Sequence, residues 1–273
     1  MAAGPELLRE LRDAWSTGSG RTRGAALVTA AVDVRRAGYH RPLPLELLRD
    51  LHESYLHDRG GAALRPESWD TALEWATQPL HATSSLLEPS ANEKFLAFDY
   101  LVDAAAQDPA TPPVPDATWH AVLEHAAPPD LPGIAWEASF AGGLDHVRRA
   151  LDRALALNEY VVAAALADCL GDAGQEVMAS ARLETIIAEA EASGQVSTED
   201  LLRMRNDLAW MVGGKVTGRG DSERALRIAQ NVVRESTTAL GDNHPRTLYA
   251  RLTLARLLGD CGAAQEALNL AEH

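Results

Sequence analysis

The glycine-rich run Gly18-Ser-Gly20-Arg-Thr-Arg-Gly24 has the small residues that a phosphate-binding loop requires. Such a loop also needs a Lys-Ser/Thr pair, which contacts the phosphate and Mg²⁺, and an apolar strand in front of it. The run lacks both features. We therefore predict a flexible tether at this position and no nucleotide-binding site.

Two histidines stand near each other in His52-Glu53-x-x-x-His57. In a zinc protease helix the paired histidines are four residues apart and share one face. Here they are five residues apart, which turns the two imidazoles about 140° away from each other on a helix. We therefore predict solvated or half-buried histidines and no metal site.

The two cysteines, Cys169 and Cys261, are too few for a disulfide framework or a zinc site. Both lie among apolar neighbours in predicted helices, which favours small core residues in a reducing cytoplasm. The sequence has no Gly-x-Ser-x-Gly motif, and its carboxylates are scattered over predicted helix surfaces. We predict no catalytic residue, no cofactor and no enzyme. An unrecognised enzyme is an alternative that would require a deep polar pocket with clustered titratable groups.

The chain has 273 residues, of which 46% are hydrophobic, and a formal net charge of −14. Ala and Leu dominate the apolar residues, which favours closely packed helices over sheets. Without a basic stripe, binding to nucleic acid or to an anionic membrane is not expected. The sequence also has no signal peptide and no apolar run of about 18 residues. We therefore expect a cytoplasmic protein.

A repeated pattern organises the second half of the chain. The pattern Leu-Ala-x-x-Leu/Val, followed by Gly-x4-Ala, begins at Leu166, Leu208 and Leu254, so the copies are 42 and 46 residues apart. The second copy is longer because Lys215 to Arg219 extends its turn, and a weaker copy begins at Ile134. A fixed period of this length is typical of stacked helical hairpins.

Each residue type in the pattern has a structural reason. The Leu and the small residue after it suit the crossing of two antiparallel helices. The Gly suits the end of the first helix, where the chain turns through a positive φ. The final Ala faces back onto the first helix. A small residue suits this position, because a larger side chain would push the two helices apart. One hairpin cannot bury its own apolar stripe, so neighbouring hairpins must stack.

The first half has a different organisation. Helix-period segments over 5–14, 25–37, 45–57 and 66–77 precede two short runs, 82–87 and 94–100, that suit a β-hairpin. The last three of these helices, followed by the hairpin, predict a winged-helix-like domain. Four prolines in 107–116 predict a joint. The expected parts are an N-terminal helix and tether (1–23), the winged-helix-like domain (24–108), a Pro-rich joint with one short helix (109–130), and about four repeats, the last one truncated (131–273).

The spacing of the repeats resembles that of tetratricopeptide repeats. The connector Leu240-Gly241-Asp242-Asn243-His244-Pro245 closely matches the variety found in kinesin light chain and in many actinobacterial proteins. Gly241 suits a helix end, Asn243 or His244 suits the cap of the next helix, and Pro245 suits its first turn. The resemblance implies a mainly α-helical solenoid that binds other proteins.

The first half carries a second resemblance. The segments Arg35 to Pro44, Trp75 to Leu87 and Phe98 to Leu101 resemble a part of actinobacterial STAND-type signalling NTPases. In those proteins this part joins the ATPase module to C-terminal repeats. No ATPase module is found in this sequence, so the resemblance implies an ATPase partner in cis or in trans. The truncated last repeat also leads us to expect self-association through its exposed apolar face.

The first helix of each tetratricopeptide-like hairpin lines the concave surface, and we expect a peptide or protein partner there. A winged-helix transcriptional regulator with a repeat sensor is an alternative, although the helix expected over 66–77 has no basic residue for DNA. A different role for the tryptophans, packing between repeats, also stays open. The candidate groove residues are Trp136, Asp168, Arg203, Asn206, Trp210, Tyr249 and Arg256.

Overall fold

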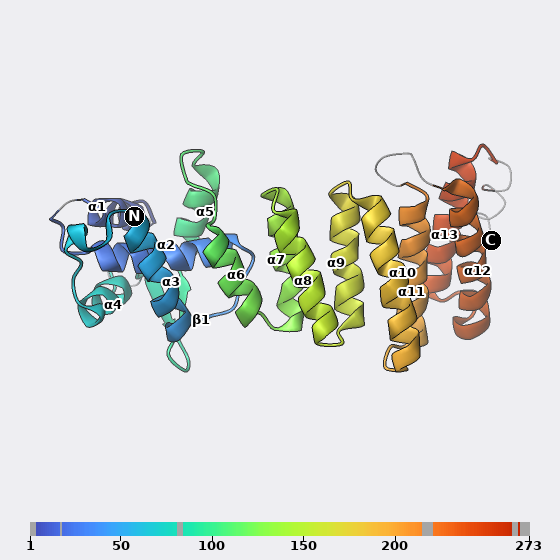
Figure 1. Cartoon of the computed structure of the whole chain (residues 1–273), viewed down its shortest axis with the longest axis horizontal. Coiled ribbons are helices and arrows are strands. Elements are labelled where there is room, and N and C mark those ends of the chain that lie inside the picture. The colour runs from blue at the N-terminus through green and yellow to red at the C-terminus, as the bar shows by residue number, and fades with distance from the viewer. Residues whose placement is uncertain (1–3, 17, 81–83, 215–220, 264–266, 268–273) are drawn as a thin grey trace. The chain divides into compact units, whose positions relative to one another are not determined.

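The computed structural model describes residues 4–16, 18–80, 84–214, 221–263 and 267. The chain divides into two compact units, Met1–Glu137 and Ala138–His273. Helices α1 to α13 dominate the described residues (Figure 1). In these ranges, no helix is both long enough and apolar enough to cross a membrane. The fold is therefore mainly helical, as the composition predicts.

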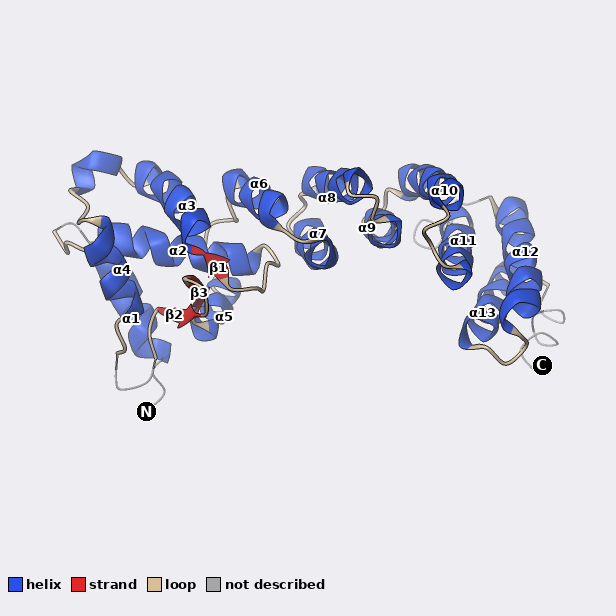
Figure 2. Ribbon diagram, turned by 90° about the horizontal axis from the view of Figure 1, so that it is seen from below, coloured by secondary structure: helices blue, strands red, loops and turns tan. Residues whose placement is uncertain are grey.

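The first unit combines helices with one small sheet. Figure 2 shows its three short strands among the helices, with β1 and β2 on either side of β3. Its elements are α1 (Gly4–Ala14), α2 (Thr22–Arg36), β1 (Leu43–Pro44), α3 (Leu45–Asp58), η1 (Gly61–Leu64), α4 (Trp69–Thr77), β2 (Leu87–Ser90), β3 (Lys94–Ala97), α5 (Asp99–Gln107), α6 (Asp116–His125) and η2 (Pro128–Asp130).

Helix α2 is the centre of the first unit. Apolar residues are buried on all its sides, from Ala25 to Val34, and it packs against α1, α3, α4, α5 and α6. A helix that is apolar all round belongs in the interior. The expected helix over 25–37 is therefore present, and it begins three residues earlier, at Thr22.

A hairpin is formed by β2 and β3, which pair antiparallel with Leu87 opposite Ala97 and Ser90 opposite Lys94. Its first strand begins at Leu87, the last residue of the run 82–87 expected to form it, so the strand was predicted too early. Strand β1 pairs with the other edge of β3. The start of the predicted run 82–87 lies outside the described residues. The helix expected over 66–77 begins later, at Trp69, because the Ser68 side chain caps it by accepting a hydrogen bond from the Thr71 amide.

A buried polar network joins α2, α3 and α6. The Tyr55 hydroxyl donates to Asp33 Oδ2 at 2.9 Å and lies 2.8 Å from Thr118 Oγ1. Arg36 pairs with Asp33 and also donates to the carbonyl of Pro112. Burial raises the pKa of the Asp33 carboxyl. These contacts tie the Pro-rich segment 109–130, expected as a separate joint, into the same compact unit as 24–108.

The second unit consists of helical hairpins. Helix α7 (Leu131–Phe140) spans the boundary between the units, and consecutive helices from α8 to α13 pack against each other. The helices of the second unit are α8 (Leu144–Ala156), α9 (Tyr160–Asp172), α10 (Glu176–Ser193), α11 (Thr198–Val212), α12 (Ser222–Leu240) and α13 (Pro245–Asp260). The second helix expected for the last repeat, apart from Ala267, and the expected turn Lys215 to Arg219 lie outside the described residues.

The three strong copies of the pattern occupy equivalent places. Leu166, Leu208 and Leu254 begin it in α9, α11 and α13, and all three are buried. Gly174 follows α9 with a φ of +80°, as a helix end requires. In the second copy Gly214, with a φ of +75°, follows α11, and the pattern's Gly220 lies outside the described residues.

Glycines also lie where the first helices of consecutive copies meet. Helix α9 contacts α11, and α11 contacts α13. A Cβ on Gly171 would lie 3.5 Å from Met211 Sδ, and a Cβ on Gly213 would lie 2.6 Å from Leu257 Cδ2. Met211 and Leu257 hold equivalent positions in their copies, so each copy inserts a large side chain against the glycine of the copy before it.

The connector before α13 has the expected chemistry. Helix α12 ends at Leu240, with Gly241 as its C-cap. Of the two capping candidates, the structure uses His244, whose Nδ1 accepts a hydrogen bond from the Arg246 amide at 3.2 Å. Pro245 occupies the first turn of α13, where a missing N–H has no consequence.

We expect Gly38→Ala to destabilise the first unit. Gly38 has a φ of +85°, and a Cβ there would lie 2.7 Å from the carbonyl oxygen of Gly133, a backbone atom that cannot move aside easily. The left-handed conformation and the clash together should lower the free energy of unfolding by about 2 to 4 kcal/mol. Denaturation followed by tryptophan fluorescence measures this loss. Five of the six tryptophans belong to the first unit, and only Trp210 belongs to the second, so the signal reports mainly on the first unit.

The matched control is Gly61→Ala. Gly61 has a φ of +55°, but a Cβ there would meet nothing within 4 Å. The free energy of unfolding of Gly61→Ala should fall only by the cost of the left-handed conformation, about 1 to 2 kcal/mol. Equal losses for the two variants would show that the approach of Gly38 to Gly133 is unimportant.

Candidate functional site

Six of the seven candidate groove residues lie on the first helices of the three strong copies, and one of the six, Asn206 on α11, is buried. Helix α9 carries Asp168, α11 carries Arg203 and Trp210, and α13 carries Tyr249 and Arg256. Because α11 contacts both α9 and α13, the three helices present one continuous side. We call the part of it formed by these five residues the first-helix face.

The Arg256 guanidinium covers the indole ring of Trp210, with Cζ 5.1 Å from the ring centroid. The two residues hold the same place in consecutive copies, two positions after the first Leu of the pattern. Arg256 is exposed and Trp210 is half-buried. Over the described ranges, Arg256 has no carboxylate partner. A cation on an indole face is attracted by the ring quadrupole, so the pair is held in place without an acid.

The other charged residues of the face are more constrained. Arg203 donates to Asp207 Oδ2 at 3.0 Å, and the two side chains are only 18% and 19% exposed. Asp168 is half-buried and engaged in other interactions. Tyr249 is 53% exposed, so its ring is open to a partner. The part of the face around Trp210, Tyr249 and Arg256 is therefore the most accessible for binding.

The structure places Asn206 differently from the expectation. Its side chain belongs to α11 but is only 4% exposed, and its Oδ1 has no hydrogen-bond partner among the described residues. It stands one turn after Leu202, which packs against Val232 and Ala250. Asn206 is therefore an interior residue, and we remove it from the candidate groove. Trp136 is 50% exposed on α7 in the first unit, and its place in a groove stays a prediction.

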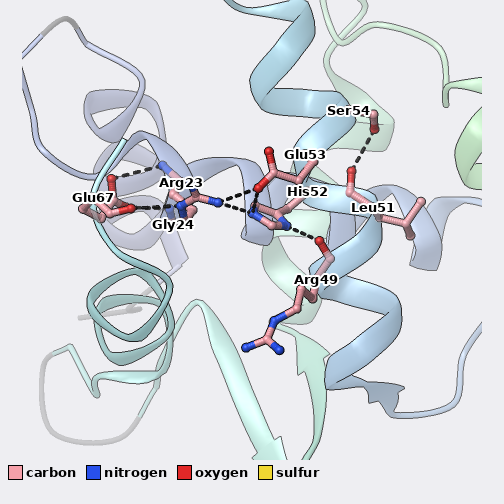
Figure 3. Close-up of polar contacts among 8 residues, drawn as sticks. All are labelled: Arg23, Gly24, Arg49, Leu51, His52, Glu53, Ser54 and Glu67. Atoms are coloured by element: carbon pink, nitrogen blue, oxygen red, sulfur yellow. Dashed lines mark hydrogen bonds and ion pairs between the residues drawn. The ribbon is translucent and has the colours of Figure 1, made fainter. Parts of the chain in front are cut away.

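Among the described residues, no group of three or more His, Cys, Asp or Glu side chains is arranged to hold a metal ion. Cys169 is half-buried and Cys261 is exposed, so the expectation of two core cysteines does not hold for Cys261. A polar cluster outside the first-helix face surrounds His52 (Figure 3).

His52 is buried in the first unit, at 1% exposure, whereas His57 is exposed. The expectation of two solvated or half-buried histidines is therefore wrong for His52. Its Nε2 lies 2.7 Å from Arg23 Nη1, and its Nδ1 contacts the carbonyl oxygen of Arg49. Because the guanidinium can only donate, Nε2 must accept, and the proton sits on Nδ1. The bond from Arg23 requires a neutral imidazole, because a protonated Nε2 cannot accept.

Acidic residues complete the cluster from two sides. Glu53 accepts from Arg23 Nη1 at 2.7 Å, and this bond is the main reason that the pKa of Glu53 is lowered. The Glu67 carboxylate accepts from the backbone amides of Arg23 and Gly24, at 3.2 and 2.7 Å. Glu67 therefore caps the N-terminus of α2, whereas the sequence suggested that it begins α4.

Aromatic contacts close the remaining side of the cluster. The Trp69 ring lies 5.1 Å from the His52 ring, and the Arg49 guanidinium lies 4.7 Å from the Trp69 centroid. Burial is the main cause that lowers the pKa of His52. The cluster joins α2, α3 and the start of α4, and it leaves the imidazole without an accessible nitrogen. We assign it a structural role.

We expect the stability of the first unit to fall as the pH drops below about 6.5, the pKa of an unfolded-chain histidine. Because the pKa of His52 is lowered in the folded chain, the unfolded state binds more protons in this range. His52→Gln should flatten this dependence, whereas His57→Gln, at an exposed position, should keep it. Denaturation between about pH 6.5 and 5 followed by tryptophan fluorescence measures both. Identical slopes for the wild type and His52→Gln would contradict the assignment.

Comparisons with known proteins find similar solved structures but assign the chain to no family. No family model matches the chain, and no curated protein matches it in sequence. The chain is similar to the crystal structure of a Podosopora anserina putative kinesin light chain with nearly identical TPR-like repeats, at 18% identity and a TM-score of 0.44. That match covers 57% of this chain and 82% of the other. A crystal structure of a single-substitution variant of that protein gives the same identity and TM-score. The assignment of stacked hairpins rests on the coordinates of this chain.

Proposed function

We propose that this chain is a non-catalytic protein-interaction module and that a peptide or protein segment binds to its first-helix face. The observation that carries the proposal is the Arg256 guanidinium, held over Trp210 at equivalent places of consecutive copies. Trp, Tyr and Arg are the residues that most often dominate binding energy at protein interfaces. A pre-positioned Arg–Trp pair also loses little conformational freedom on binding.

The accessible groups favour a partner that offers a carboxylate beside an apolar or aromatic side chain. Arg256 is exposed and lacks a carboxylate partner in the described parts of the chain, so it is available to a carboxylate. Tyr249, exposed on the same helix, offers a ring for the neighbouring side chain. Arg203 is less available because Asp207 already holds it.

We place this module in a cytoplasmic signalling system of the STAND type, as its scaffold or sensor region. The support is the resemblance of three N-terminal segments, and the implied partner is an ATPase module in cis or in trans. In this proposal the first unit is a winged-helix-like domain that transmits the state of that partner. The order α2, β1, α3, α4, β2, β3 supports this interpretation.

The same element order favours one alternative, a winged-helix transcriptional regulator with a repeat sensor. DNA recognition would need basic residues on α4, the last helix before the hairpin. Helix α4 carries Asp70 and Glu74 and has no basic residue. A gel shift of duplex DNA at low salt would support the alternative, and its absence would remove it.

We expect the double variant Tyr249→Ala/Arg256→Ala to lose peptide binding. Peptides are first selected on the wild-type chain from a random displayed library, and affinities are then measured by calorimetry. Because the variant removes two exposed anchors without touching the core, it should fold normally and bind at least about tenfold more weakly.

The matched control is Val177→Ala/Arg234→Ala, which removes an exposed apolar residue and an exposed arginine from the second helices α10 and α12. It should bind the selected peptides like the wild type. Equal affinity for the groove variant, or no selectable peptide at all, would refute the proposal. Intrinsic ATP hydrolysis by the purified chain would contradict the non-catalytic assignment.

A further inference from the structure

Helix α13 carries an uncharged stripe on one side, made of Leu248, Leu252, Ala255 and Gly259. The spacings of four, three and four residues place these positions on one face of the helix. Leu248 is 47% and Leu252 is 52% exposed. A Cβ on Gly259 would meet nothing within 4 Å. Two leucines and a glycine are thus left open together on one helix.

The same positions of the previous copy are covered. Counted from the first Leu of each copy, Leu202, Asn206, Ala209 and Gly213 of α11 correspond to the α13 stripe. Leu202, Asn206 and Ala209 are buried, at 3%, 4% and 0% exposure. Leu202 packs against α12 and α13, and Gly213 receives Leu257 of α13. The α13 stripe therefore repeats the surface of an established interface, and among the described residues no helix covers it.

The α13 stripe is also complementary to itself. If two α13 helices pack antiparallel about a two-fold axis between residues 253 and 254, Leu248 of each lies opposite Gly259 of the other. In the same arrangement Leu252 lies opposite Ala255. Each large side chain thus meets a small one, which permits close approach of the helices. The two-fold axis makes each of these contacts occur twice.

We propose that the α13 stripe binds the α13 stripe of a second copy of this chain, forming an antiparallel dimer. The inference goes beyond the proposed peptide site, because Tyr249 and Arg256 lie toward the first-helix face and outside the stripe. A second copy is favoured over an unrelated helix because the stripe supplies both the leucines and the small residues that receive them. No charged side chain lies within the stripe to oppose the contact.

Sedimentation equilibrium of the full chain tests the proposal directly. The wild type should show a concentration-dependent monomer–dimer equilibrium. Leu252→Glu should weaken the dimer by more than about tenfold, because two carboxylates would be buried at the axis. The control Val177→Glu changes an 87% exposed valine on α10 and should leave the equilibrium unchanged. A wild type that stays monomeric at high concentration, or a dimer that survives Leu252→Glu, would overturn the proposal.

Cross-linking tests the direction and register of the pair. In a background with Cys169→Ser and Cys261→Ser, chains with Leu248→Cys are mixed with chains with Gly259→Cys and oxidised. The mixture should form a disulfide between unlike chains, whereas either variant alone should not. Like cysteines would lie about 16 Å apart along the helices, at 1.5 Å per residue, too far for a disulfide. Cross-linking of like chains only, or of none, would overturn the antiparallel arrangement.

Discussion

The second unit depends on how closely the first helices of consecutive repeats approach one another. Gly171 and Gly213 leave room where Met211 and Leu257 of the following copy pack. A Cβ on Gly213 would lie 2.6 Å from Leu257 Cδ2, so the present helix spacing requires a glycine or a shift of the leucine. Packing at this density is sensitive to a single methyl group. Gly213 therefore permits the present approach of α11 and α13, and the buried leucines supply the apolar area.

This spacing also shapes the proposed binding face. Trp210 and Arg256 occupy the same place in their copies, and the approach of α11 and α13 brings the guanidinium over the ring. The first-helix face is thus a product of repeat packing, and its Trp210–Arg256 pair joins positions that are 46 residues apart in the sequence. The outer side of α13 follows from the same rule, because it repeats the α11 surface without a described neighbour.

The repeat pattern was sufficient to predict the helical hairpins, their apolar contacts and the capped connector. Local chemistry determines these features: a leucine stripe, a glycine at a helix end, and His244 before Pro245. Contacts between distant segments were not predictable in this way. Glu67 caps α2 from 43 residues away, and His52 is buried because Arg23 and Trp69 close over it. Asn206 is buried because α11 has a following copy, whereas Leu252 at the same place of α13 is exposed.

A double-mutant cycle on Gly213 and Leu257 tests the glycine-mediated packing most directly. The free energy of unfolding of the second unit is measured for Gly213→Ala, Leu257→Ala and the combined variant, with the fluorescence of Trp210 as the reporter in a background whose other tryptophans are replaced by phenylalanine. If Leu257 occupies the space at Gly213, the added methyl is tolerated once the leucine is shortened, and the two losses fall short of additivity by about 0.5 to 3 kcal/mol. Losses that add within about 0.3 to 0.5 kcal/mol would contradict the account, because independent sites behave in that way.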